Sequence, residues 1–214
     1  MENTTQKSLN PLSRNFRKPA IYLRLPSNGK YWASGLDMPE NHELPVYPMT
    51  AKDEITLKTP DALLNGQGVI DVIQSCCPHI TDAWRMPSVD VDATLIAIRI
   101  ASYGTGMDFK STCPHCKNAD EHAIDLTRVL DTVKMPNYGQ DIEVEGVKIK
   151  LRPQEYFSLN ATNQIKFEEQ RLLQSISDEL AQEEKLAEFK ARITKIADLN
   201  IKVLVDSTDY IISD

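Results

Sequence analysis

The stretch from Asp90 to Leu126 constrains the fold most, because it joins one helical pattern to two strand-like patterns. Ser88 or Asp90 can cap the start of the helix, and Gly104 can supply the left-handed residue that ends it. Apolar residues between these limits recur three or four positions apart, which places them on one helical face. They are Val91, Leu95 and Ile98, with Ile96 and Ile100 broadening the face. The pattern predicts a central buried helix.

After Gly106 the spacing of apolar residues changes to strict alternation. Met107 and Phe109 alternate with polar residues up to the sequence Cys113-Pro114-His115-Cys116. A second short alternating run then contains His122, Ile124 and Leu126. Two such runs on either side of a tight connection predict a β-hairpin whose tip is a Cys-Pro-x-Cys loop.

The cysteines suggest a metal site. Two thiolates two residues apart can converge on one ion together with the backbone N–H groups of the turn. Structural zinc takes four ligands, and Cys113 and Cys116 supply two. The nearest further candidates are Cys76, Cys77 and His79, at the end of a short helix that precedes the buried helix. His115 and His122 lie within or just beyond the Cys-Pro-x-Cys loop. A zinc ion held by Cys113, Cys116 and one or both of Cys76 and Cys77 would staple that helix to the hairpin.

Two other interpretations of the cysteines stay open. Four cysteines without a secretory signal suggest a protein of the reducing cytosol. In that compartment the alternative to zinc binding is that the cysteines are free structural thiols in a tight hairpin. Redox activity is disfavoured, because a thioredoxin-type motif opens a helix after a strand. Here the motif lies between two strand-like runs, and no histidine has a nucleophile or acid partner at motif spacing. The sequence therefore offers no catalytic residue.

The N-terminal part predicts a basic arm followed by a mixed core. Residues 1–18 are polar and basic, as expected of a flexible arm. Residues 18–25 alternate as a strand, a Pro-Ser-Asn-Gly turn follows at 26–29, and residues 30–32 are expected to return as its partner strand. Pro39, Pro45 and Pro48 then favour an extended loop. We assign residues 19–153 to one α+β core domain.

Further elements of this core follow from local signals. Thr50 with an acidic pair three residues later resembles a capping box, which predicts a short helix to Leu57. Short helices are also expected at 59–64 and 68–76. Residues 142–151 alternate around Glu145-Gly146, which predicts a β-hairpin with its turn at that pair.

The C-terminal region, residues 154–214, is predicted to be helical. No proline or glycine interrupts it, which favours a helical hairpin or small bundle. Two apolar stripes support this interpretation. The first contains Tyr156, Leu159, Ile165, Leu172, Leu173, Ile176 and Leu180, and the second contains Leu186, Phe189, Ile193, Ile196 and Leu199.

Charge is distributed unevenly and indicates protein partners. Residues 1–30 hold six Lys or Arg and one acid (+6 − 1 = +5), and residues 154–214 hold seven against twelve (+7 − 12 = −5), in a chain of net charge −7. A basic N-terminal segment and an acidic C-terminal region favour protein partners of the opposite charge. The few basic residues and the absence of a reader motif argue against nucleic acid as a partner. The absence of an apolar run near 18 residues argues against a membrane partner.

Several stretches resemble the T4-type bacteriophage baseplate hub assembly proteins, the family known as T4 base plate protein. They are NPLSRNFRKPAIYLRLPSNGKYW at 10–32, the stretch LPVYPMTAKDEITLKTPDALLNGQGVIDVIQSC at 44–76, and ATLIAIRIASYG at 93–104, followed by CPHC. The resemblance spans residues 10 to about 155. It implies a phage late protein needed to build the central hub of a contractile tail baseplate, and it implies no catalytic residue.

The expected function is therefore non-enzymatic. The chain would bind other baseplate hub subunits as an assembly chaperone or minor hub component, in the host cytoplasm during assembly and in the virion tail baseplate. The alternative is a zinc-ribbon-like nucleic-acid-binding or adaptor protein, which would need a second ligand pair and a basic face.

Overall fold

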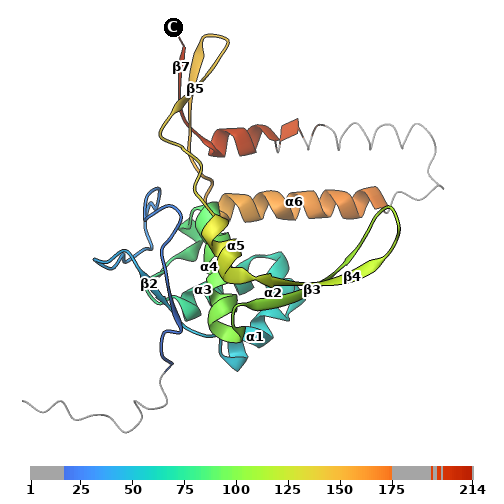
Figure 1. Cartoon of the computed structure of the whole chain (residues 1–214). Coiled ribbons are helices and arrows are strands. Elements are labelled where there is room, and N and C mark those ends of the chain that lie inside the picture. The colour runs from blue at the N-terminus through green and yellow to red at the C-terminus, as the bar shows by residue number, and fades with distance from the viewer. Residues whose placement is uncertain (1–16, 175–193, 195–196, 199, 214) are drawn as a thin grey trace, which may run out of the picture.

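The computed structural model describes residues 17–174, 194, 197–198 and 200–213 (Figure 1). Most of the predicted arm therefore lies outside the described residues, as do all five residues of the second apolar stripe and, in the first, Ile176 and Leu180. The described part is an α+β fold with small antiparallel sheets, as the sequence predicts. None of its helices combines the length and apolarity that crossing a membrane requires.

The described residues form the following helices and strands. In order they are β1 (Ile21–Leu23), β2 (Leu44–Val46), α1 (Ala51–Leu57), α2 (Pro60–Leu64), α3 (Gln67–Cys76), the 3₁₀ helix η2 (Ala83–Arg85), α4 (Ser88–Tyr103), β3 (Gly106–Thr112), β4 (Ala119–Asp125), α5 (Leu126–Thr132), β5 (Asp141–Val144), β6 (Val147–Leu151), α6 (Tyr156–Gln174) and β7 (Thr208–Ser213). Residues 200–206 are also helical.

Helix α4 lies in the centre of the core, as the apolar spacing predicts. Its buried residues Val91, Ala97 and Ile98 belong to one apolar cluster with α3, β1 and β2. Gly104 has a φ of 84° and its N–H donates to the Ile100 carbonyl, which closes the helix. The predicted side-chain cap is wrong. Pro87 occupies the N-cap position without a side-chain hydrogen bond.

The helix α1 begins with the capping box that the sequence predicts. The Thr50 hydroxyl accepts from the Asp53 N–H at 3.3 Å, and the Asp53 carboxylate accepts from the Thr50 N–H at 2.7 Å. The Ser75 hydroxyl also donates to this carboxylate at 3.1 Å. Arg17, which the sequence places in the arm, donates to the Ser75 carbonyl at 3.1 Å and lies 4.0 Å from Asp53. The last residues before the core are thus tied to it.

The partner of the first strand differs from the prediction. Strand β1 pairs with β2, with Tyr22 opposite Pro45, whereas residues 26–31 form turns. Asn28 and Tyr31 have φ values of 54° and 67°, a left-handed backbone that cannot extend a strand. Proline fits β2 because each strand of a two-stranded sheet has one edge that needs no donor.

The expectation of a helical region throughout 154–214 is also wrong at its end. Residues Thr208–Ser213 form β7, which pairs antiparallel with β6 and places Ile211 opposite Ile149. The result is a three-stranded sheet in the order β5-β6-β7, which Figure 1 shows standing away from the helices. The sequence Tyr-Ile-Ile at 210–212 favours a strand, since aromatic and β-branched residues pack well on a pleated surface.

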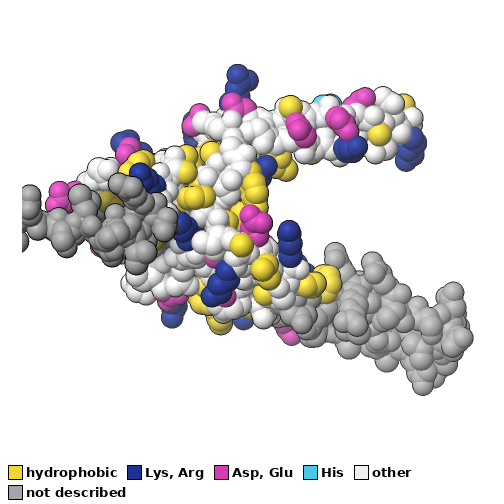
Figure 2. Space-filling model, turned by 90° about the horizontal axis from the view of Figure 1, so that it is seen from below, with side chains coloured by type: hydrophobic (Ala, Val, Ile, Leu, Met, Phe, Trp, Pro, Cys, Tyr) yellow, Lys and Arg dark blue, Asp and Glu magenta, His cyan; other side chains and the backbone are white. Residues whose placement is uncertain are grey.

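Strands β3 and β4 form a two-stranded antiparallel ribbon, with Gly106 opposite Asp125 and Thr112 opposite Ala119. Figure 1 shows the ribbon leaving the helices, and it is the described arm at the upper right of Figure 2. Cys113 and Cys116 lie in the loop at its free end. A tight Glu145-Gly146 turn likewise joins β5 to β6, with positive φ at both residues, as a type I′ turn requires.

Candidate functional site

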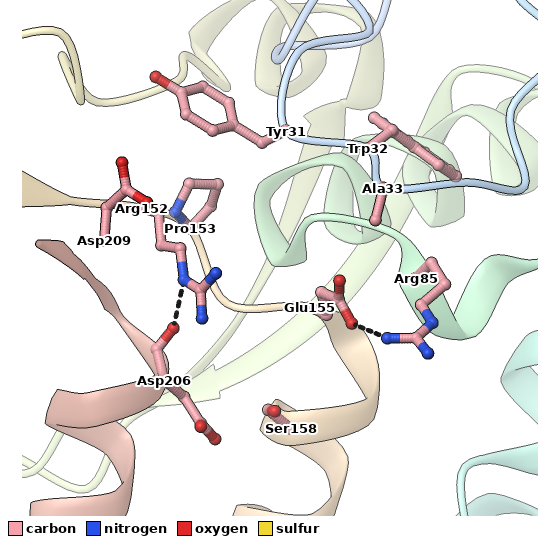
Figure 3. Close-up of a pocket in the computed structure, with 10 residues that line it drawn as sticks. All are labelled: Tyr31, Trp32, Ala33, Arg85, Arg152, Pro153, Glu155, Ser158, Asp206 and Asp209. Carbon is pink, nitrogen blue, oxygen red and sulfur yellow. Dashed lines mark hydrogen bonds and ion pairs between the residues drawn. The ribbon is translucent and has the colours of Figure 1, made fainter.

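A polar pocket of about 490 Å³ lies where the C-terminal sheet meets the helices (Figure 3). Four segments distant in sequence line it. Tyr31 and Trp32 come from the turn region after β1, Arg85 ends η2, and residues 152–158 run from the end of β6 into the first turn of α6. Asp206 and Asp209 add carboxylates from the segment that leads into β7. The pocket therefore forms only when the chain's middle and C-terminal segments are assembled.

Hydrogen bonds across this pocket fix the base of the sheet. Arg85 donates from Nη1 to the Glu155 carboxylate at 2.9 Å. Arg152 donates from Nε to the Asp206 carbonyl at 3.1 Å, and its backbone N–H donates to the Ser207 carbonyl at 2.8 Å. These bonds hold the start of β7 beside the end of β6, so the pocket positions the sheet.

One polar atom near the pocket has no partner in the described structure. Oδ2 of Asp206 is buried and makes no hydrogen bond among the described residues. A buried carboxylate oxygen is costly to leave unpaired, so it favours an N–H or cationic donor from outside. The residues that line the pocket include no histidine or cysteine, so Ser158 has no histidine base beside it in this lining. The lining suits side-chain recognition better than nucleophilic catalysis.

The C-terminal sheet presents one apolar face, which we call the apolar sheet face. Ile142 lies opposite Ile149, Val144 opposite Val147, and Ile149 opposite Ile211. Directly paired residues project from the same side of a sheet, so these five side chains share one face.

The opposite face of the same sheet is polar in character. It carries Glu143, Lys148 and Lys150, together with Tyr210 and Ile212. Lys150 lies 3.4 Å from the Asp141 carboxylate, which also accepts a hydrogen bond from the Tyr210 hydroxyl at 3.2 Å. The two faces thus differ sharply in polarity.

The apolar sheet face is accessible to solvent. Ile142 is 46% exposed, Val144 50% and Ile211 62%. Apolar residues scattered singly on a surface are ordinary, but a contiguous group across three strands marks an interaction surface. The alternation within residues 142–151 predicted the part of this face that β5 and β6 supply. It did not predict Ile211, which joins the face only once β7 has paired with β6.

The four cysteines that the sequence proposed as zinc ligands lie in two different places. Cys76 and Cys77 are fully buried in the core at the end of α3. Burial raises the pKa of both thiols, that of Cys77 to about 12. Cys113 and Cys116 are in the loop of the β3–β4 ribbon, and Cys116 is exposed. Within the described residues, no group of three or more His, Cys, Asp or Glu side chains could hold a metal ion.

Asp90 has a role that the sequence did not reveal. Its carboxylate is fully buried and accepts hydrogen bonds from the Ser27 N–H at 2.8 Å, from the Ser27 hydroxyl, and from Trp32 Nε1 at 2.8 Å. Burial raises the pKa of Asp90, while these three hydrogen bonds act to lower it. Asp90 thereby anchors to α4 the turn that supplies Tyr31 and Trp32 to the pocket.

Comparison with family models matches residues 19–211 to the family described as T4 bacteriophage base plate protein. The matched range includes the polar pocket and extends into β7. Comparisons with curated proteins and with solved structures gave no match.

Proposed function

The chain belongs to the T4 bacteriophage base plate protein family, and on this premise we propose that it binds other baseplate hub subunits during tail assembly. It acts without catalysis, as an assembly factor or minor hub component. It works in the host cytoplasm, where tails are built, and in the baseplate of the virion tail. The family match supports a structural role in the baseplate. The proposed mode of binding rests on the surface of this chain.

The apolar sheet face is the observation that carries the proposal. A small sheet is independently stable when it has three or more strands with a hydrophobic face, or when it packs against a helix. In the described structure the sheet stands apart from the helices (Figure 1), and Ile142, Val144 and Ile211 are between 46% and 62% exposed. A hub subunit that presents a complementary apolar surface would cover this face. The polar opposite face would stay in solvent, which fixes the orientation of binding.

The size of the effect follows from burial. Burying a fully exposed isoleucine side chain gives about 1.5–3 kcal/mol. Three side chains that are about half exposed would together contribute on the order of 3 kcal/mol or more. Removing a hot-spot residue at the centre of an interface weakens the free energy of binding by about 2 kcal/mol or more. A change of about 2 kcal/mol corresponds to about a 30-fold change in affinity.

The test uses two neighbouring residues on opposite faces of β7. Ile211→Asp places a charge in the apolar sheet face, and the matched control Ile212→Asp places the same charge on the polar face. Both residues are exposed, 62% and 51%, and both lie in the same edge strand, so any loss of sheet stability is shared.

Each variant is co-expressed with the hub subunits of the same phage, and the affinity for the subunits that co-purify with the unmodified chain is then measured. We expect Ile211→Asp to weaken binding at least about 30-fold and Ile212→Asp to change it less than about threefold. Equal effects of the two variants, or unchanged binding by both, would show that the apolar sheet face does not bind the hub subunits. Deleting residues 154–214 is a blunter test, because it also removes β7 from the sheet.

A further inference from the structure

The loop at the tip of the β3–β4 ribbon is closed by its own backbone. The Cys113 N–H donates to the Asn118 carbonyl at 2.9 Å, and the Lys117 N–H donates to the Cys113 carbonyl at 2.9 Å. Hydrogen bonding from the backbone N–H groups of Cys116 and His115 and from the Cys116 side chain lowers the pKa of the Cys113 thiol. The two sulfurs therefore lie together on one side of the loop, with amide dipoles directed at one of them.

This arrangement matches what two thiolates need to hold one ion. In a Cys-x-x-Cys zinc loop the sulfurs converge while backbone N–H groups of the turn stabilise the thiolate charge. The hydrogen bonds to Cys113 provide that stabilisation before any metal binds. Lys117, directly after Cys116, has a φ of 59°, a left-handed conformation that is strained for a residue with a side chain. Lys117 adopts this strained conformation in an exposed loop.

The ribbon needs support beyond its own strands. Every residue of β3 is exposed, and so are all those of β4 except Ile124, which is partly exposed. A two-stranded ribbon without a packed face is marginal in water. The described structure provides no cover for it, and Figure 2 shows it projecting freely with side chains of both charges along it.

The chain's other two cysteines are poor candidates to complete a site. Cys76 and Cys77 are fully buried in the core, whereas the loop is at the free end of the ribbon (Figure 1). The Cys76 sulfur already accepts a hydrogen bond from Arg17 Nη2 at 3.3 Å. Bringing the core thiols to the loop would disrupt the cluster that holds α3 against α4.

We propose that Cys113 and Cys116 form half of a site for a thiophilic divalent cation, zinc, and that the same loop of a second copy of this chain supplies the other half. Two ribbon tips can meet on a two-fold axis without contact between the bodies, because each tip is the end of a projecting arm (Figures 1 and 2). One zinc ion and four thiolates carry a net charge of −2, and the two Lys117 side chains beside them would balance it. Four thiol protons pass to solvent as the ion binds.

The test uses the full-length chain, freed of metal by a chelator and kept reduced. Cobalt(II) is the spectroscopic probe, because tetrahedral thiolate coordination gives it strong visible absorption, and zinc is used for sedimentation. We expect cobalt absorption to saturate at one ion per two chains. We also expect zinc to convert monomer to dimer and a chelator to reverse the change.

Variants separate this site from one that uses the core thiols. Cys113→Ser and Cys116→Ser should each abolish the thiolate–cobalt absorption and the zinc-dependent dimer. Cys76→Ala and Cys77→Ala, two matched controls with folding checked by circular dichroism, should retain both.

Three results would overturn the inference: saturation at one ion per monomer, absence of thiolate–cobalt absorption, or loss of binding in the folded core variants. The readout uses the chain alone, so it succeeds or fails independently of hub-subunit binding by the apolar sheet face.

Discussion

Asp90→Ala should lower the free energy of unfolding by about 3–5 kcal/mol, because it removes one buried acceptor that three donors share. The donors are the Ser27 N–H at 2.8 Å, the Ser27 hydroxyl, and Trp32 Nε1 at 2.8 Å. Ser27 is itself buried, so water cannot replace the lost acceptor without opening the turn.

The magnitude combines two opposing contributions. Each buried donor left without an acceptor costs about 1–3 kcal/mol, which gives roughly 3–9 kcal/mol for three. The variant also removes the cost of burying a carboxylate, the same cost that raises the pKa of Asp90. Because this gain offsets part of the loss, we expect the lower half of the range. For a chain of this size, that corresponds to a fall in Tm on the order of 10 °C.

The assay is urea unfolding followed by tryptophan fluorescence, with Asp92→Ala as the matched control. Asp92 lies on the same helix but is exposed, so its removal changes the same charge without orphaning a donor. We expect the control to change stability by less than about 0.5 kcal/mol. A loss below about 1 kcal/mol for Asp90→Ala, or a loss equal to that of the control, would refute the reasoning.

Three further predictions follow from local contacts. A thiol reagent should modify the two loop cysteines of the folded chain and spare the two core cysteines, whose pKa burial raises; rapid modification of all four before urea is added would contradict this. Burial acts to raise the pKa of Asp53, but the hydrogen bonds from Thr50 and Ser75 and the charge of Arg17 lower it below 3.8. Its stabilisation is therefore fully present above that value and lost as pH falls through the lowered pKa, so thermal unfolding should show the deficit of Asp53→Asn shrinking in acid; a deficit independent of pH would argue against it. Gly35 and Gly146 share a φ of 83°, but an added Cβ would lie 2.5 Å from Asp82 Cβ at Gly35 and in open space at Gly146. Gly35→Ala should thus cost about 1–3 kcal/mol more in urea unfolding than Gly146→Ala, and equal costs would show that the close approach to Asp82 is unimportant.

The sequence predicted those elements whose signals are local. The 3.6-residue spacing and Gly104 identified α4, the Thr50 capping box identified α1, and Glu145-Gly146 identified the β5–β6 turn. Each signal acts within a few residues, so it needs no knowledge of the rest of the fold. Non-local pairing carried no such signal. The pairing of β1 with β2 spans a long loop, and that of β6 with β7 spans α6.

The candidate site depends mostly on non-local pairing, which is why the sequence revealed little of it. Ile211 and Ile212 are chemically identical neighbours, and only the register with Ile149 decides which one joins the apolar sheet face. The same limit applies to the cysteines. The spacing of Cys113 and Cys116 predicted their convergence, but no spacing could tell that Cys76 and Cys77 are enclosed in the core.

Hydrogen exchange of the full-length chain, measured with and without its co-purified hub subunits, shows whether those subunits cover the C-terminal sheet. We expect binding to slow exchange chiefly in residues 141–151 and 208–213, which form the three strands of the C-terminal sheet. Unchanged exchange in these strands, with slowing confined to other parts of the chain, would contradict it.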